Sequence, residues 1–206
     1  PESEQALFEK AEINAEKFKE YNEALSDYNR FIEENPEAEL APEAQFRIAS
    51  IMENYLEKYD LAFEKYQAVV ENYPKSDMVA KALNRAAAIA SDKLQDRAEA
   101  IEIYLRIAED YSQAEIGGKA RISAAKLFYQ EEQYAKAVEQ YTILYRSAPM
   151  DEESIPYIKE AAKIYENQLG NIDMAIETWS QITENFPGTE EAQNARAKIE
   201  ELSQQR

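Results

Sequence analysis

Apolar and polar residues follow a helical period along most of the chain. Residues 59–76, YDLAFEKYQAVVENYPKS, show the pattern: Ala62, Tyr66 and Val69 are spaced by four and then three positions, and Pro74 ends the run. Spacings of three and four place side chains on one face of an α-helix, and proline cannot continue a helix. The segment therefore predicts an amphipathic helix that ends near its proline.

The same kind of segment occurs five times. The copies align without gaps and cover residues 21–36, 59–74, 97–112, 134–149 and 172–187. Each copy has an alanine, an aromatic residue four positions later and an apolar residue three positions beyond that. The alanines are Ala24, Ala62, Ala100, Ala137 and Ala175, at successive spacings of 38, 38, 37 and 38 residues. The aromatic residues are Tyr28, Tyr66, Tyr104, Tyr141 and Trp179. Such a period is typical of repeat proteins.

A second predicted helix precedes each copy and has its own alanine every time. These alanines are Ala11, Ala49, Ala87, Ala124 and Ala162. An alanine in every copy implies that two helices approach too closely at this point for a larger side chain. The repeated unit is therefore a helix pair, with helix A followed by helix B. Stacked pairs bury their apolar faces on their neighbours, so the predicted fold is an all-α solenoid.

The predicted domain organisation is a single solenoid over residues 1–206. Its five pairs cover about 5–38, 42–76, 80–113, 117–150 and 155–188, and a capping helix covers about 189–203. Thr189 can cap the N-terminus of that last helix. Its packing face consists of Ala192, Ala195, Ile199 and Leu202. The remaining face is polar, as the exposed end of a repeat array requires.

The recurring positions form columns when the five copies are aligned, and these columns resemble the tetratricopeptide repeat (TPR). The shared features are a small residue in helix A, alanine followed by an aromatic residue in helix B, and proline at the end of most copies. The resemblance covers nearly the whole chain, although the period is longer than the usual ~34 residues. The helix A tryptophan of the family is also replaced, by Leu7, Gln45, Leu83, Ala120 and Ile158. The resemblance implies a right-handed superhelix with a concave groove, lined by helix A, that binds peptides or proteins.

Two stretches resemble TPR proteins of the bacterial envelope in particular. They are NYPKSDMVAKAL at residues 72–83 and NFPGTEEAQNARAKIEEL at residues 185–202. They are similar to the periplasmic coordinator of the Tol-Pal system and to the TPR lipoprotein of outer-membrane barrel assembly. This resemblance implies a location in the bacterial periplasm or cell envelope, with the cytoplasm as the alternative.

One column of helix A is expected to face the groove. Three residues before each helix A alanine stand Phe8, Phe46, Asn84, Arg121 and Lys159, and neighbouring groove positions include Phe128 and Lys163. The column changes from apolar to polar to cationic along the chain. Its aromatic residues could anchor apolar side chains of a partner, and its cations could pair with carboxylates. The alternative is that the aromatic residues belong to the core and the cations are solvated.

The fourth pair departs from the pattern of the others. Lys119 and Lys126 stand where the other pairs mostly have Ala and Ile, and Ser112 takes the place of the usual proline. Gly117 and Gly118 follow shortly afterwards, and adjacent glycines give the backbone unusual freedom. The departure indicates either a hinge or partner contact, or a local repacking in which the lysine stems lie along apolar surface.

Composition removes several classes of function. The net charge of −18 disfavours binding to nucleic acids and to anionic lipid surfaces. The sequence has no His and no Cys, which removes imidazole bases, thiol nucleophiles and Cys/His metal sites. Runs of carboxylates such as Glu33–Glu34 lie at predicted helix ends and polar faces, where solvation and the helix dipole explain them. We expect no enzyme activity, no cofactor, no metal and no insertion into a membrane.

The function that these observations predict is a non-enzymatic scaffold or adaptor that binds a protein or peptide segment in the groove of a repeat array. Two alternatives remain open. The array could associate with itself as a structural element, or it could be the docking module of a larger regulatory or enzyme chain.

Overall fold

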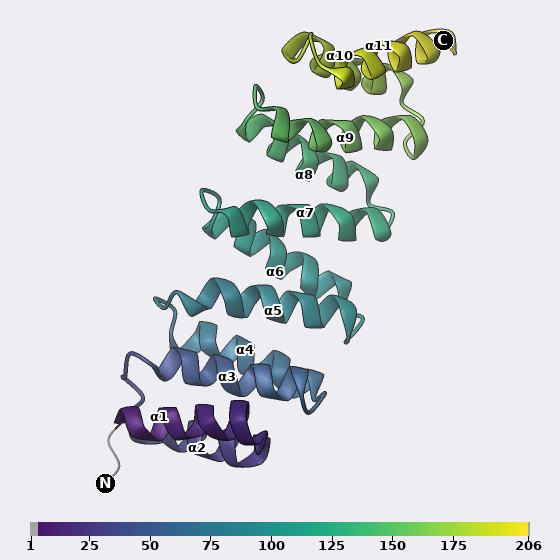
Figure 1. Cartoon of the computed structure of the whole chain (residues 1–206). Coiled ribbons are helices and arrows are strands. Elements are labelled where there is room, and N and C mark those ends of the chain that lie inside the picture. The colour runs from purple at the N-terminus through teal and green to yellow at the C-terminus, as the bar shows by residue number, and fades with distance from the viewer. Residues whose placement is uncertain (1–3, 206) are drawn as a thin grey trace. The chain divides into compact units, whose positions relative to one another are not determined.

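The computed structural model describes residues 4–205, which form eleven α-helices and no strand (Figure 1). The A helices are α1 (Glu4–Ile13), α3 (Ala41–Asn54), α5 (Met78–Asp92), α7 (Glu115–Gln130) and α9 (Ile155–Asn167). The B helices are α2 (Tyr21–Glu34), α4 (Tyr59–Asn72), α6 (Arg97–Asp110), α8 (Tyr134–Ser147) and α10 (Ile172–Asn185). A π-helical turn, Asn14–Phe18, extends α1, and a 3₁₀ turn, Glu152–Ser154, precedes α9. The last helix is α11 (Glu190–Ser203). The predicted all-α fold class is confirmed.

The repeated residues form the core of the pairs. Both alanine columns are completely buried, with an exposed fraction of 0% at every member from Ala11 to Ala175. The aromatic residues of helix B, from Tyr28 to Trp179, are 1–8% exposed. Because each core position recurs in every pair, one helical pattern buries similar side chains five times. The close helix contact that the alanines predicted explains why no larger residue occupies those columns.

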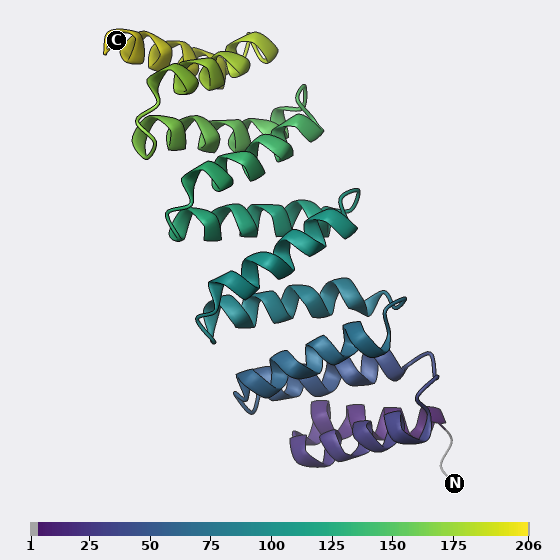
Figure 2. The same cartoon turned by 180° about the vertical axis from the view of Figure 1, so that it is seen from behind.

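The chain divides into two compact units, Pro1–Ile107 and Ala108–Arg206. In the first unit, each helix from α1 to α4 packs against the next one, and α3 also contacts α5. The A helices of this unit lie in one layer and its B helices in a second (Figures 1 and 2). The core of the first two pairs includes Phe8, Tyr28, Phe31 and Ile48.

The second unit repeats this arrangement. Helices α7 to α11 pack in sequence order, with α7, α9 and α11 in one layer and α8 and α10 in the other. The hydroxyl oxygen of Thr189 accepts a hydrogen bond from the amide of Ala192 at 3.1 Å, so α11 begins with the side-chain cap that the sequence predicted. Ala192, Ala195 and Leu202 of α11 are fully buried.

Every turn between helix A and helix B contains one residue in the left-handed backbone region. These residues, with their φ angles, are Lys19 (57°), Glu57 (52°), Gln95 (59°), Glu132 (57°) and Gly170 (59°). The amide that follows donates back into helix A, for example from Lys58 to the carbonyl of Met52 at 2.8 Å. Such a bond pairs a carbonyl that would otherwise be left free at the helix end. In the fourth pair the bond runs from the amide of Gln133 to the carbonyl of Phe128 at 2.8 Å, which is the bond of a Schellman motif.

The irregular fourth pair has a specific steric basis. Gly117 and Gly118 lie in the first turn of α7, and Gly117 is buried. A β-carbon on Gly117 would overlap the carbonyl group of Tyr111, whereas one on Gly118 would meet no atom within 4 Å. Gly117 therefore allows the turn after α6 to lie directly on α7. Lys119 is exposed and pairs with Glu115 at 2.6 Å. This packing fits the local-repacking interpretation, and the hinge stays a prediction.

Candidate protein-binding face

The predicted groove residues of the first unit lie mostly in or near the core. Phe8 is 5% exposed, and its ring meets the rings of Tyr28 and Phe31 edge-on at centroid distances of 5.5 Å. For Phe8 the core alternative therefore holds. Phe46 is half-buried, with its ring edge-on to Tyr66 at 5.1 Å. Asn84 is half-buried on α5.

Two predicted groove residues of the second unit make internal contacts. The guanidinium of Arg121 donates to Oε1 of Gln140 at 2.7 Å and to the carbonyl of Ala108 at 3.2 Å. Arg121 thus ties α7 to α8 and to the end of α6. Phe128 is 5% exposed, and Nζ of Lys136 lies 5.4 Å from its ring centre. A cation at this distance from an aromatic face is attracted to it.

Lys159 and Lys163 are the predicted residues that the structure brings together. They lie one turn apart on α9, Lys159 half-buried and Lys163 exposed. Nζ of Lys163 contacts Oε1 of Glu160 at 2.7 Å, an exposed pair of the kind that contributes little stability. Both lysines line the same two hollows beside α9.

Three hollows lie on the A-helix layer of the second unit. The first, of about 340 Å³, lies between α7 and α9 and includes Lys126, Tyr129 and Ile164. The other two lie between α9 and α11 and measure about 270 and 380 Å³. The larger of these is lined by Lys159, Lys163, Glu166, Asn167, Trp179, Asn194 and Lys198. Successive A helices therefore leave room between them for side chains of another molecule.

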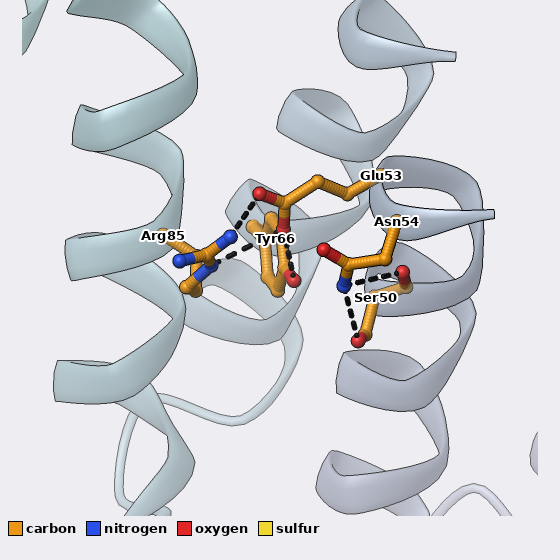
Figure 3. A network of polar contacts seen from close by, with 5 residues as sticks. All are labelled: Ser50, Glu53, Asn54, Tyr66 and Arg85. Atoms are coloured by element: carbon orange, nitrogen blue, oxygen red, sulfur yellow. Dashed lines mark hydrogen bonds and ion pairs between the residues drawn. The ribbon is translucent and has the colours of Figure 1, made fainter. Parts of the chain in front are cut away.

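A buried polar network in the first unit shows how the A and B helices are joined (Figure 3). Glu53 of α3 is only 9% exposed. Its Oε2 accepts from the hydroxyl of Tyr66 at 2.9 Å and from Nε of Arg85 at 3.1 Å, while its Oε1 pairs with a second guanidinium nitrogen. Burial, and then the nearby Glu53 carboxylate, raise the pKa of Tyr66 above its ordinary value of 10. The carboxylate is satisfied on both oxygens.

The second unit has the same network positions with different residues. In the first unit, the aromatic residue and the cation stand 13 and 32 residues after the glutamate, at Glu53, Tyr66 and Arg85. The same two spacings recur in the second unit at Glu166, Trp179 and Lys198. Nζ of Lys198 contacts Oε1 of Glu166 at 2.8 Å and also Oε2 of Glu201 at 3.1 Å. These two hydrogen bonds raise the pKa of Lys198 above its ordinary value.

Two polar atoms of this second network are buried without a partner. They are Oε2 of Glu166 and Nε1 of Trp179, and neither has a hydrogen bond to any group in the part of the chain that the structure describes. Both residues line the 380 Å³ hollow between α9 and α11. Sequence reasoning missed this site, although the repeated spacing of glutamate, aromatic residue and cation is visible in the sequence.

Comparisons with known proteins agree with the geometry. A family model described as the tetratricopeptide repeat matches residues 5–38, 43–76 and 160–189. These ranges fall on the first, second and fifth helix pairs. These three pairs are therefore identified as tetratricopeptide repeats, and the predicted resemblance to this repeat is confirmed for them. No curated protein sequence matched the chain.

Solved structures show the same fold at low sequence identity. A tetratricopeptide repeat protein from Parabacteroides merdae superposes with a TM-score of 0.61 at 15% identity, over 98% of this chain and 73% of that one. YrrB, described as a TPR protein with an unusual peptide-binding site, gives a TM-score of 0.55 at 16% identity, over 93% of this chain and 91% of that one. A chain of the Naa15/Naa10 complex bound to HypK-THB gives a TM-score of 0.60 at 17% identity, over 91% of this chain and 26% of that one.

Each helix among residues 4–205 is too short or too polar to cross a lipid bilayer. Within the same residues, the acidic side chains form no group of three or more that could hold a metal ion.

Proposed function

We propose that this protein is a non-enzymatic scaffold that binds a segment of another protein on the A-helix layer of its second unit. The observation that carries the proposal is the row of hollows between α7, α9 and α11, with Lys159 and Lys163 shared by two of them. Helical repeats with spaces between successive A helices can accept side chains of an extended segment along the layer.

Charge favours an acidic segment at this place. In a chain with a net charge of −18, three lysines and one glutamate line the 380 Å³ hollow. The 270 Å³ hollow differs, because Glu152, Glu160 and Glu191 line it beside two of these lysines. Lys159 and Lys163 lie on neighbouring turns of α9, and Lys198 lines the same 380 Å³ hollow. Complementary charge speeds encounter and selects the partner more than it adds affinity.

Two of the structural relatives support an interaction role. YrrB is described as having a peptide-binding site, and the Naa15/Naa10 complex is described as bound to HypK-THB. The bacterial periplasm or envelope is the proposed location, supported by the resemblance of residues 72–83 and 185–202 to envelope TPR proteins. The cytoplasm is the alternative location.

Site-specific photo-crosslinking tests the proposed face. A photoreactive amino acid is placed at position 163 on α9 or, as the control, at position 177, an exposed site on α10 in the other layer. We expect crosslinks to one defined protein segment from position 163 and none to that segment from position 177. Equal crosslinking from both positions, or crosslinks only from 177, would overturn the proposal.

Light scattering over a range of concentrations tests the self-association alternative. A scaffold that binds a separate partner keeps its monomer mass when it is diluted or concentrated alone. Growth of mass with concentration, together with crosslinks at position 163 to a second copy of the same chain, would favour the self-associating array instead.

A further inference from the structure

We infer that the hollow between α9 and α11 binds the carboxamide side chain of an Asn or Gln residue that is followed by an acidic residue in the partner segment. This inference rests on the proposed function and adds the chemistry of the occupant. It is carried by two buried atoms without a partner, Oε2 of Glu166 and Nε1 of Trp179, whose residues line that hollow.

The network of the first unit shows what the second one lacks. There, the hydroxyl of Tyr66 and the guanidinium of Arg85 together occupy both oxygens of Glu53. In the second unit a tryptophan takes the place of the tyrosine, and its Nε1 makes no bond to the glutamate. A lysine takes the place of the arginine, and its ammonium contacts only Oε1 of Glu166. Each replacement leaves one polar atom free.

A buried donor and a buried acceptor without partners are both unfavourable, so a group that pairs with both is bound preferentially. A carboxylate offers no donor and an ammonium offers no acceptor. A primary carboxamide offers an N–H and a C=O on the same edge, which can donate to Glu166 and accept from Trp179. The volume of about 380 Å³ is large enough for a side chain and exceeds the space that one water molecule needs.

The lysines determine what must accompany the carboxamide. Lys159 and Lys163 line the same hollow from α9, where Lys163 makes one exposed pair with Glu160, whereas Lys198 is held by two carboxylates. An acidic residue next to the Asn or Gln would therefore meet Lys159 and Lys163. The expected motif is short, and it differs from a motif that is recognised by charge alone because it requires the neutral amide.

Two capped peptides test the inference on the whole chain. The probe is acetyl-Gly-Gln-Glu-Gly-N-methylamide, and the control, acetyl-Gly-Leu-Glu-Gly-N-methylamide, has the same charge but no carboxamide. Trp179 is the only tryptophan, so its fluorescence and its indole N–H resonance report directly on the site. We expect the Gln probe to shift that resonance and to bind about tenfold more tightly than the Leu control, which leaves both atoms unpaired.

A Trp179→Tyr variant provides the matched protein control. The tyrosine hydroxyl is expected to bond to Glu166 as Tyr66 bonds to Glu53, which closes the site and removes the preference for the Gln probe in calorimetry. Because the indole resonance is measured on the unaltered protein, a variant that fails to fold does not prevent the test.

Equal binding of the two peptides with no change of the indole resonance would overturn the inference, and a bridging water would then complete the site. The proposed function is tested separately from this inference. If a crosslinked partner segment still binds and responds to charge reversal of Lys159 and Lys163, the face is correct and only its occupant is wrong.

Discussion

Glu53 is held by one tyrosine and one arginine, whereas Glu166, at the equivalent place, is held by one lysine. The difference arises from two substitutions on the same repeated backbone, Tyr to Trp and Arg to Lys. Arginine presents a fork of donors that reaches both carboxylate oxygens, and lysine is a single point charge. At the scale of the residue, small changes in donors therefore convert a closed structural network into one with free polar atoms beside a hollow.

The titration of Tyr66 gives a prediction at high pH. Burial and the Glu53 carboxylate raise the pKa of Tyr66 above its ordinary value of 10. A group whose pKa is raised in the folded state contributes stability below its unfolded pKa and loses it as the pH rises towards the folded pKa. We expect Tyr66→Phe to lower the Tm at pH 8, and this deficit to narrow as the pH rises above 10. Parallel melting curves for both proteins from pH 8 to 11 would contradict this.

Helix positions could be predicted from the sequence because the apolar spacing and the alanine columns recur in all five pairs. The conformations of the turns could not. Four of the five left-handed residues are Lys, Glu or Gln, and only Gly170 carries the usual signal for that backbone. Similarly, Gly117 reads as a flexible site in the sequence, whereas in the structure it allows a close contact with Tyr111.

The backbone conformations of two glycines, one in a turn and one in a helix, predict opposite effects of substitution by alanine. Gly170→Ala places a β-carbon in the left-handed region and should destabilise the protein by about 1 kcal/mol. The control, Gly118→Ala, lies within α7 in open space and should stabilise by about 0.5–1 kcal/mol, since alanine favours the helix. Urea unfolding of the two variants measures both effects. A loss of stability at position 118 equal to that at 170 would show that the turn is not the cause.

Close packing between helices predicts the effect of a larger side chain. Ala87 of α5 is completely buried, so Ala87→Leu should overpack the contact and destabilise the protein by about 1–3 kcal/mol. Asn84, three residues earlier and half-buried, provides the matched control, and Asn84→Leu should cost much less. Equal losses of stability in the two variants would mean that the alanine column does not mark the close contact.

At the scale of the whole molecule, the chain consists of repeated pairs that fall into two compact units. The fold class, the resemblance to tetratricopeptide repeats and the capping helix could be predicted, because each depends on patterns repeated along the sequence. The candidate site could be predicted only in part. Lys159 and Lys163 lie on the face that carries the hollows, but Phe8 belongs to the core and Arg121 bonds to Gln140. Sequence spacing alone does not show which side chains find partners inside the fold.

Local opening should differ between two junctions. The junction before α7 has Ser112 in place of proline, two glycines, and no side-chain cap at Ala114. The junction before α5 has Pro74, and the hydroxyl of Ser76 accepts from the amide of Met78 at 3.1 Å. We expect faster amide exchange at residues 112–120 than at 74–80, because the proline and the side-chain bond of Ser76 restrain only the second junction. Equal or slower exchange at 112–120 would contradict a hinge there.

The central claim is that the A-helix layer of the second unit binds a partner segment. Its most direct test is the affinity of the segment identified by crosslinking, measured for the double variant Lys159→Glu, Lys163→Glu. Arg121 is left unchanged because it holds α7 to α8. The control is Glu177→Lys, which alters charge on the other layer.

Reversal of both lysines should weaken binding at least about tenfold at low salt and less at high salt, because screening reduces the contribution of exposed charges. Circular dichroism should show that the double variant keeps its helical fold. An unchanged affinity in a folded double variant, or an equal loss in Glu177→Lys, would contradict the account and place the partner elsewhere on the molecule.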